Sequence, residues 1–97
     1  GKAIVSNDPE DANSRMNEGD ILVTKATDKD MMKAIEKAGG IITEEGGLTS
    51  HAAVVGLSLE IPVIVGVKDA TIFIKDGDDI TIDGSTGNIY EGHASVL

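Results

Sequence analysis

One histidine in this chain stands where it could act as a nucleophile. Gly46 and Gly47 come shortly before it, and Thr49 and Ser50 lead directly into His51. Glycine lets the backbone take positive φ or approach a ligand closely, and Thr or Ser is a common helix N-cap. We therefore expect His51 in the first helical turn, where the positive end of the helix favours the neutral imidazole. A neutral imidazole is a nucleophile, and the free N–H groups of that turn can bind phosphoryl oxygens.

This stretch predicts a phosphohistidine site, or a non-covalent site for a small anion such as phosphate or sulfate. The candidate phosphoryl acceptor is His51, and the candidate supporting residues are Gly46, Gly47, Thr49, Ser50 and Ala52. A plainer reading stays open, because a histidine in a first helical turn is usually a surface or structural residue, and the glycines could simply form a turn. Glu44 and Glu45 are expected to be solvated loop charges that would repel a phosphate at close range.

Composition narrows the possible partners. The 97 residues fit one domain, residues 1–97, and 40% hydrophobic with 26% charged residues is typical of globular chains. The formal net charge of −9 repels nucleic-acid backbones and anionic membranes, so neither is an expected partner. With no cysteine, disulfides and thiolate metal sites are excluded, and no metal site is expected. No signal peptide or membrane-spanning apolar run is recognisable.

The elements that must position His51 alternate along the chain. Continuously apolar runs predict strands at Lys2–Val5, Ile21–Thr24, Ile41–Thr43 and Val63–Val65. Between them, a possible capping box at 27–30 precedes an apolar stripe of Met31, Ile35 and Ala38, which predicts a helix. A second helix should run from near Ser50 to about Leu59, before Pro62. This alternation predicts a parallel sheet with right-handed crossovers and both faces covered.

The last third of the chain has a different pattern. The runs 80–83 and 88–91 flank the turn residues 84–87, which predicts an antiparallel hairpin. The acidic segment 76–79 is expected to be a solvated turn, because it lacks the spacing of an EF-hand loop. Residues 71–74 could form a strand or a short helical turn. The polar segment 6–20 could hold a helical turn after Pro9 or be a long loop.

The run Thr43–Ala53, continued by Ile61–Gly66, resembles the phosphohistidine (swivelling, or mobile) domain of phosphoenolpyruvate-utilising enzymes. That family includes pyruvate phosphate dikinase, phosphoenolpyruvate synthase and enzyme I of the sugar phosphotransferase system. The resemblance covers most of residues 21–92. It implies an α/β fold, a three-layer β/β/α swivelling domain with a central parallel sheet and an antiparallel hairpin layer. In the family, the His of Thr-Ser-His carries a phosphoryl group between remote active sites, and His51 would be that residue.

Within this family, residues 21–23, 27–32 and 92–97 look like the extra C-terminal domain of bacillus-type pyruvate kinases. The resemblance implies a piece of a cytoplasmic, tetrameric glycolytic enzyme that converts phosphoenolpyruvate and ADP to pyruvate and ATP. Its partners would be the catalytic portion of its own chain and neighbouring subunits. The parent enzyme would use Mg²⁺ and K⁺, and this domain would need no cofactor of its own. The isolated domain is not expected to be catalytic, although this stays open, and the parent protein would be a phosphotransferase.

The sequence departs from the carriers of this family at one pair of positions. The carriers have Ala-Arg five and six residues after the histidine, whereas this chain has Gly56 and Leu57. An arginine there is the kind of residue that binds a phosphate bidentately. Its replacement by leucine favours a structural or regulatory accessory domain, with an active phosphocarrier as the alternative.

Overall fold

A computed structural model describes residues 1–46, 51–83 and 88–91 of the chain. A parallel sheet of four strands has the order β1-β2-β3-β4, and a separate antiparallel hairpin pairs β5 with β6. The strands are β1 Ala3–Val5, β2 Ile21–Thr24, β3 Gly40–Thr43, β4 Val63–Ile64, β5 Ile80–Asp83 and β6 Asn88–Glu91. The helices are α1 Pro9–Arg15, η1 Lys29–Met31, α2 Met32–Lys37, α3 His51–Leu59 and α4 Ala70–Phe73.

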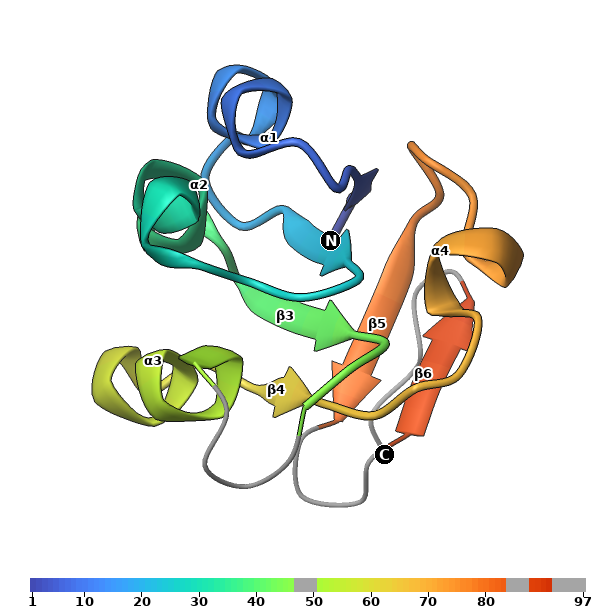
Figure 1. The fold of residues 1–97 in the computed structure, drawn as a ribbon. Helices are drawn as coiled ribbons and strands as arrows, with labels where there is room; N and C mark the ends of the chain where they lie inside the picture. The colour runs from blue at the N-terminus through green and yellow to red at the C-terminus, as the bar shows by residue number, and fades with distance from the viewer. Residues whose placement is uncertain (47–50, 84–87, 92–97) are drawn as a thin grey trace.

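The molecule has three layers. Helices α1, α2 and α3 cover one face of the parallel sheet, and the β5-β6 hairpin lies on the other side together with α4 (Figure 1). This is the three-layer β/β/α arrangement that the family resemblance implied. The sequence pattern itself predicted the parallel pairing of the central sheet and the antiparallel pairing of the hairpin.

Alternate residues of the strands belong to two separate apolar clusters, one on each face of the sheet. Toward the helices, the sheet contributes Ile4, Leu22 and Ile41. Toward the hairpin and α4, it contributes Ala3, Ile21, Val23 and Ile42. Because successive strand side chains point to opposite faces, a run such as Ile-Leu-Val in β2 is buried on both sides. The continuously apolar strands therefore follow from the two covered faces.

Most of the expected elements are confirmed, and the open segments are now assigned. The segment 6–20 contains α1, which begins at Pro9 after Asp8 caps it by accepting a hydrogen bond from Glu10 N. Residues 70–73 form the short helix α4 and not a strand. α3 ends at Leu59, where Glu60 takes a left-handed φ of 59° before Pro62. The turn at 84–87 lies outside the described residues.

The predicted capping box at 27–30 is wrong by one residue. Asp28, and not Thr27, is the N-cap of η1, and its side chain accepts a hydrogen bond from Asp30 N at 2.8 Å. Aspartate and threonine are both good N-cap residues, so their adjacency made the assignment from sequence ambiguous. The consequence is that the Thr27 hydroxyl is available for a different contact, described below.

The acidic turn at 76–79 closes the β1 side of the domain. Arg15 binds both carboxylate oxygens of Asp76, at 3.0 and 2.6 Å, and Val5 N donates to the same carboxylate at 2.9 Å. Asp76 is thus a structural partner and not merely a solvated charge. Within the described ranges, no group of three or more His, Cys, Asp or Glu residues could hold a metal ion.

Two glycines let neighbouring layers approach closely. A Cβ at Gly40 in β3 would overlap Ile82 of the hairpin, so the missing side chain makes room for that isoleucine. A Cβ at Gly56 in α3 would overlap Val63 Cγ2 and lie 3.1 Å from Val63 Cβ. A rotation of Val63 could move Cγ2 away, but the contact to its Cβ would stay tighter than most contacts of this kind unless the backbone shifts. Gly56 therefore sets the distance between α3 and β4.

In the described part of the chain, no helix has the length and apolar character needed to cross a bilayer.

We predict that Gly56→Ala destabilises the domain although alanine is the better helix former. Overpacking against Val63 should lower the free energy of unfolding by about 1–3 kcal/mol, measured by urea denaturation. Ser58→Ala is the matched control, because Ser58 is exposed in the same helix and should leave stability unchanged or slightly raised. A Gly56→Ala protein as stable as this control would contradict the close packing of α3 on β4.

Candidate functional site

The candidate site begins where two neighbouring parallel strands end. Thr24 of β2 and Thr43 of β3 are register partners, and both side chains are fully buried. The Thr43 hydroxyl donates to Glu45 O at 2.7 Å, and the Thr24 hydroxyl lies 3.2 Å from Asn7 Oδ1 and 3.4 Å from Ala26 O. Each threonine thus interacts with the loop that follows its own strand. Ligand sites in open α/β sheets lie at this carboxyl edge.

The two loops run side by side beyond the strands. Glu44 N donates to Thr24 O at 3.2 Å, and Glu45 N donates to Lys25 O at 2.9 Å, which extends the β2-β3 pairing past the sheet. Gly46 follows with a φ of 113°, a conformation that L side chains rarely adopt. This confirms the expected need for glycine at that position. The chain is described again from His51, the first residue of α3.

His51 lies at the amino end of α3 with an exposed side chain. Its Nδ1 is 2.9 Å from the Thr27 hydroxyl, which comes from the loop after β2. If Nδ1 carries the proton and donates to the hydroxyl, the ring presents the lone pair of Nε2; if the hydroxyl donates, Nε2 carries the proton. In either state, Nδ1 is engaged and Nε2 is the nitrogen that remains for a ligand. The contact fixes the ring orientation at the start of the helix.

A hollow of about 280 Å³ lies beside this ring. The residues that line it are Ala26, Thr27, Glu45, Gly46, His51 and Ala52. The first backbone N–H groups of a helix have no partner within that helix, and they form a natural site for an anion. Glu45 also lines the hollow, and a carboxylate at this residue disfavours a second negative charge nearby. The volume of the hollow and its position at a helix start fit a small polar ligand. The negative charge of Glu45 weakens the attraction of the hollow for a phosphate.

Glu44 is not the solvated charge that the sequence predicted. Its carboxylate accepts hydrogen bonds from Thr71 N at 2.8 Å and from the Thr71 hydroxyl. These two bonds, aided by the positive charge of Lys25, hold the pKa of Glu44 below its ordinary value. The bonds tie the beginning of the β3–α3 loop to α4. Glu45, in contrast, is exposed as expected and lines the hollow.

The structure brings together part of the predicted site and adds one residue to it. His51, Gly46 and Ala52 meet at the hollow, with Ala52 buried. The remaining predicted residues, Gly47, Thr49 and Ser50, lie outside the described residues. Thr27 was missed as a site residue, because its sequence context suggested a helix cap. Its position in the loop that follows β2, the neighbour of β3, was the available signal.

The two positions that distinguish this chain from the carriers it resembles lie further along α3. Gly56 is buried against β4, and the Leu57 side chain is 83% exposed. The site where those carriers have an arginine therefore presents an apolar side chain to the surroundings. In the described lining of the hollow there is no Lys or Arg.

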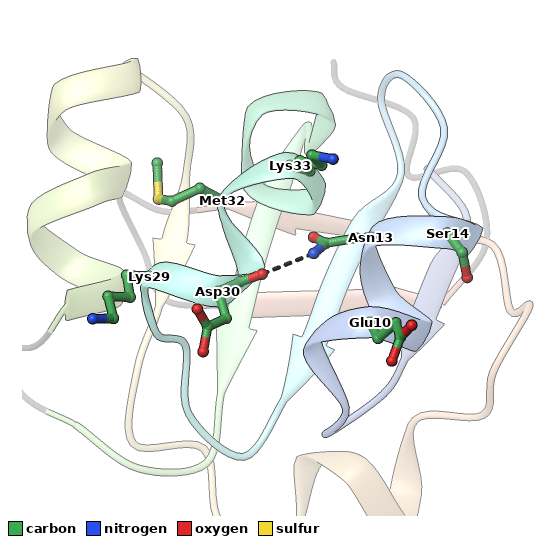
Figure 2. A pocket seen from close by; sticks show the side chains of 7 residues that line it. All are labelled: Glu10, Asn13, Ser14, Lys29, Asp30, Met32 and Lys33. Atoms are coloured by element: carbon green, nitrogen blue, oxygen red, sulfur yellow. Dashed lines mark hydrogen bonds between the residues drawn. The ribbon is translucent and has the colours of Figure 1, made fainter.

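A larger hollow, of about 560 Å³, lies between α1 and the η1–α2 segment. Asn13 spans it by donating to Asp30 O at 2.8 Å and accepting from Ala34 N at 2.9 Å. Lys29 and Lys33 point in opposite directions from its rim, so they do not converge on a common point (Figure 2). The Asn13 amide joins the two helical segments and is not left for a ligand. The size of this hollow alone does not make it a binding site.

Comparison with known proteins agrees with this geometry. The family profile described as "PEP-utilising enzyme, mobile domain" matches residues 16–87. The chain belongs to this family. A solution NMR structure of an Enzyme I protein (nEIt) has the same fold, with a TM-score of 0.68 and 31% sequence identity. The match covers 81% of this chain and 33% of that chain.

This mobile domain also has close relatives among much longer proteins. It is 67% identical to a pyruvate kinase of Geobacillus stearothermophilus and 57% identical to one of Bacillus licheniformis, over all 97 residues in both alignments. It is 47% identical over 97 residues to a probable phosphoenolpyruvate synthase of Pyrococcus abyssi. The chain spans only 16%, 17% and 12% of these three relatives, respectively.

We predict that Thr27 and His51 are energetically coupled. A double-mutant cycle with Thr27→Val and His51→Ala should give a coupling of about 0.5–1.5 kcal/mol in the free energy of unfolding, the usual net value of one hydrogen bond. Urea denaturation of the four proteins at a single pH provides the measurement. Effects that add within about 0.3 kcal/mol would show that the ring is not held.

We also predict that the Glu44–Thr71 contact stabilises the fold in a pH-dependent way. Because the folded-state pKa of Glu44 is lowered, its contribution is present above the ordinary value of 4.5 and is lost as the pH falls through the folded-state value. Thr71→Val should therefore be less stable than the parent protein at neutral pH, and the difference should shrink below that value. Urea midpoints at several pH values measure this.

Thr71→Ser serves as the matched control for that series, because serine keeps the hydroxyl donor. It should follow the pH profile of the unchanged protein more closely than the valine variant does. A stability difference between Thr71→Val and the unchanged protein that is constant across the acidic range would argue against an ionic contact.

Proposed function

We propose that this mobile domain is an accessory module of a larger pyruvate kinase, with a structural or regulatory role. The observation that carries this proposal is the alignment of the entire chain, at 67% identity, with 16% of a pyruvate kinase. In such a parent, the remaining chain would convert phosphoenolpyruvate and ADP to pyruvate and ATP. Its catalytic portion would hold the Mg²⁺ and K⁺ that the resemblance implies, and the enzyme would be cytoplasmic.

The chemistry of the His51 hollow supports a role without group transfer. Transfer to a histidine requires the site to bind a phosphoryl group with several negative oxygens, which cations such as arginine stabilise best. Here the lining includes Glu45 and, within its described residues, no Lys or Arg. Leu57 stands where the resembled carriers have an arginine. A chain with a net charge of −9 adds further repulsion.

The same hollow supports a weaker function, the non-covalent binding of a small phosphate or sulfate anion. A helix start such as that of α3 offers backbone N–H donors to an anion, and Gly46 allows the loop to come close. The Thr27 contact holds the ring in place beside them. Bound anion would then stabilise the loop that joins β3 to α3, in proportion to its concentration relative to its Kd.

An active phosphocarrier is the second candidate, and one observation favours it. The Thr27 contact engages Nδ1 of an exposed ring, which leaves Nε2 as the candidate acceptor. In that reaction, a bond would form between Nε2 and the phosphorus of phosphoenolpyruvate while the bond to the enol oxygen breaks. The enolate of pyruvate would leave and take a proton on carbon. Gly46 and Gly47 would let the donor approach, and Thr49 and Ser50 would orient the ring or cap the helix.

We predict that removing residues 1–97 from the parent enzyme leaves its catalytic step largely intact. Turnover should change by less than about tenfold, because no group of this domain enters the chemical step, and a lost catalytic group typically costs much more. The thermal unfolding midpoint, the response to effectors, or both should change. Steady-state kinetics and thermal unfolding of the full-length and shortened enzymes test this. Complete loss of turnover in a folded, shortened enzyme would contradict the accessory role.

A labelling experiment separates this proposal from the phosphocarrier. The full-length enzyme is incubated with phosphoenolpyruvate, and peptides are searched for an acid-labile, base-stable phosphate on His51. The accessory role predicts no label under conditions that charge a known carrier domain. A label that is present in the unchanged enzyme and absent in His51→Gln would establish the carrier instead.

A further inference from the structure

The segment from His51 to Val67 is almost free of charge. Glu60 is its only Asp, Glu, Lys or Arg, although such residues make up 26% of the whole chain. The segment contains α3 and β4, which lie next to each other at the edge of the domain opposite α1 (Figure 1). Depletion of charge is typical of the cores of protein–protein interfaces.

The outer side of α3 presents apolar side chains where a surface helix normally presents polar ones. Val54 is 56% exposed and Leu57 is 83% exposed. These residues are three positions apart, so they are neighbours on the helix surface. Isolated exposed leucines are common in proteins, but here two large apolar residues adjoin each other within a segment whose only Asp, Glu, Lys or Arg is Glu60. We call this pair, together with the outer edge of β4, the α3–β4 surface.

The outer edge of β4 adds to this surface. β4 pairs with β3 and is the last strand in the order of the parallel sheet. Among the described strands, none pairs with its other edge, and Val63 is partly exposed. The opposite edge of the sheet differs, because Lys2, next to β1, forms an isolated antiparallel β-bridge through its backbone with Asp79. An open strand edge next to exposed apolar side chains favours contact with another protein surface.

A second exposed apolar pair provides an internal comparison. Ile72 and Phe73 of α4 are 76% and 53% exposed, values close to those of Leu57 and Val54. Their surroundings in sequence are highly charged, with Lys68, Asp69, Lys75, Asp76, Asp78 and Asp79. An apolar pair among so many charges lacks the charge depletion of an interface core. Similar exposure in two different settings therefore allows a matched experiment.

We propose that the α3–β4 surface is the docking site for the catalytic portion of the parent chain. This inference rests on the proposed accessory function. The pyruvate kinase relatives extend far beyond the domain, which spans only 16–17% of them, so most of such a chain is available as a partner. A covalently attached partner has an effective concentration on the order of millimolar, which favours it over a second copy of this domain. The partner surface should be apolar and uncharged, to match α3.

Docking at this surface would connect the partner to the His51 hollow. His51 begins the helix that carries Val54 and Leu57, and Gly56 fixes the distance of that helix from β4. A partner that holds α3 would therefore also hold the amino end of the helix, where the hollow lies. Occupancy of the hollow and the tightness of docking would then be linked, each favouring the other.

The test uses single cysteines in the full-length parent, because this domain contains no cysteine. With any cysteines elsewhere in the chain replaced, Leu57→Cys is paired with Ile72→Cys, and Val54→Cys with Phe73→Cys. In the domain alone, the members of each pair have nearly equal exposure, 83% against 76% and 56% against 53%. We expect thiol modification at 57 and 54 to be at least about tenfold slower than at 72 and 73 in the native enzyme, since access controls the rate. The rates should become equal in denaturant.

A photo-crosslinker attached at position 57 identifies what covers the surface. Crosslinks between position 57 and the catalytic portion of the same chain are the expected result. Crosslinks to residues 1–97 of another copy would overturn the proposal, and so would comparable modification rates within either pair. These readouts do not depend on activity. If this docking test fails but the enzyme without residues 1–97 keeps its turnover as predicted above, only the docking proposal is contradicted. The proposed accessory function is then unaffected.

Discussion

The parallel pairing of β2 with β3 is the constraint on which the candidate site depends. It places two loops at one edge of the sheet, and the buried pair Thr24 and Thr43 makes hydrogen bonds to the loop after each strand. The pairing then continues beyond the sheet through Glu45 N and Lys25 O. Only because the loops are joined in this way can Thr27 reach a ring 24 residues later in the chain. The site is therefore a product of sheet register more than of the residues next to the histidine.

The candidate site also depends on the position of α3, which packing on both faces of the sheet determines. The helix lies close to β4 because Gly56 has no side chain to separate it from Val63. On the opposite face, Gly40 admits Ile82 of the hairpin. Interiors are packed at close to crystal density, so a displacement in one layer is transmitted to the next. The position of the amino end of α3 therefore depends in part on the contact at Gly56, five residues further along the same helix.

Local sequence patterns predicted the strands, helices and their order, but they could not predict contacts between segments that are far apart in the chain. The apolar runs at 21–24 and 41–43 identify strands because burial on both faces dictates their composition. The amino end of α3 was predictable from the residues before it. The Thr27–His51 and Glu44–Thr71 contacts were not, since each joins segments more than twenty residues apart through tertiary packing. Thr27 was misassigned because Asp28 next to it can cap a helix equally well.

The amino end of α3 and its outer side would bind a partner through different interactions. At its amino end, a phosphate would be attracted by backbone donors that act only at hydrogen-bond distance, and would be opposed by Glu45 and by the net charge of −9. Along its outer side, apolar burial is proportional to area and is not screened by salt. The described lining of the hollow contains no Lys or Arg that would offset the repulsion of a phosphate. These differences support the proposed docking role of α3 over the transfer of a phosphoryl group.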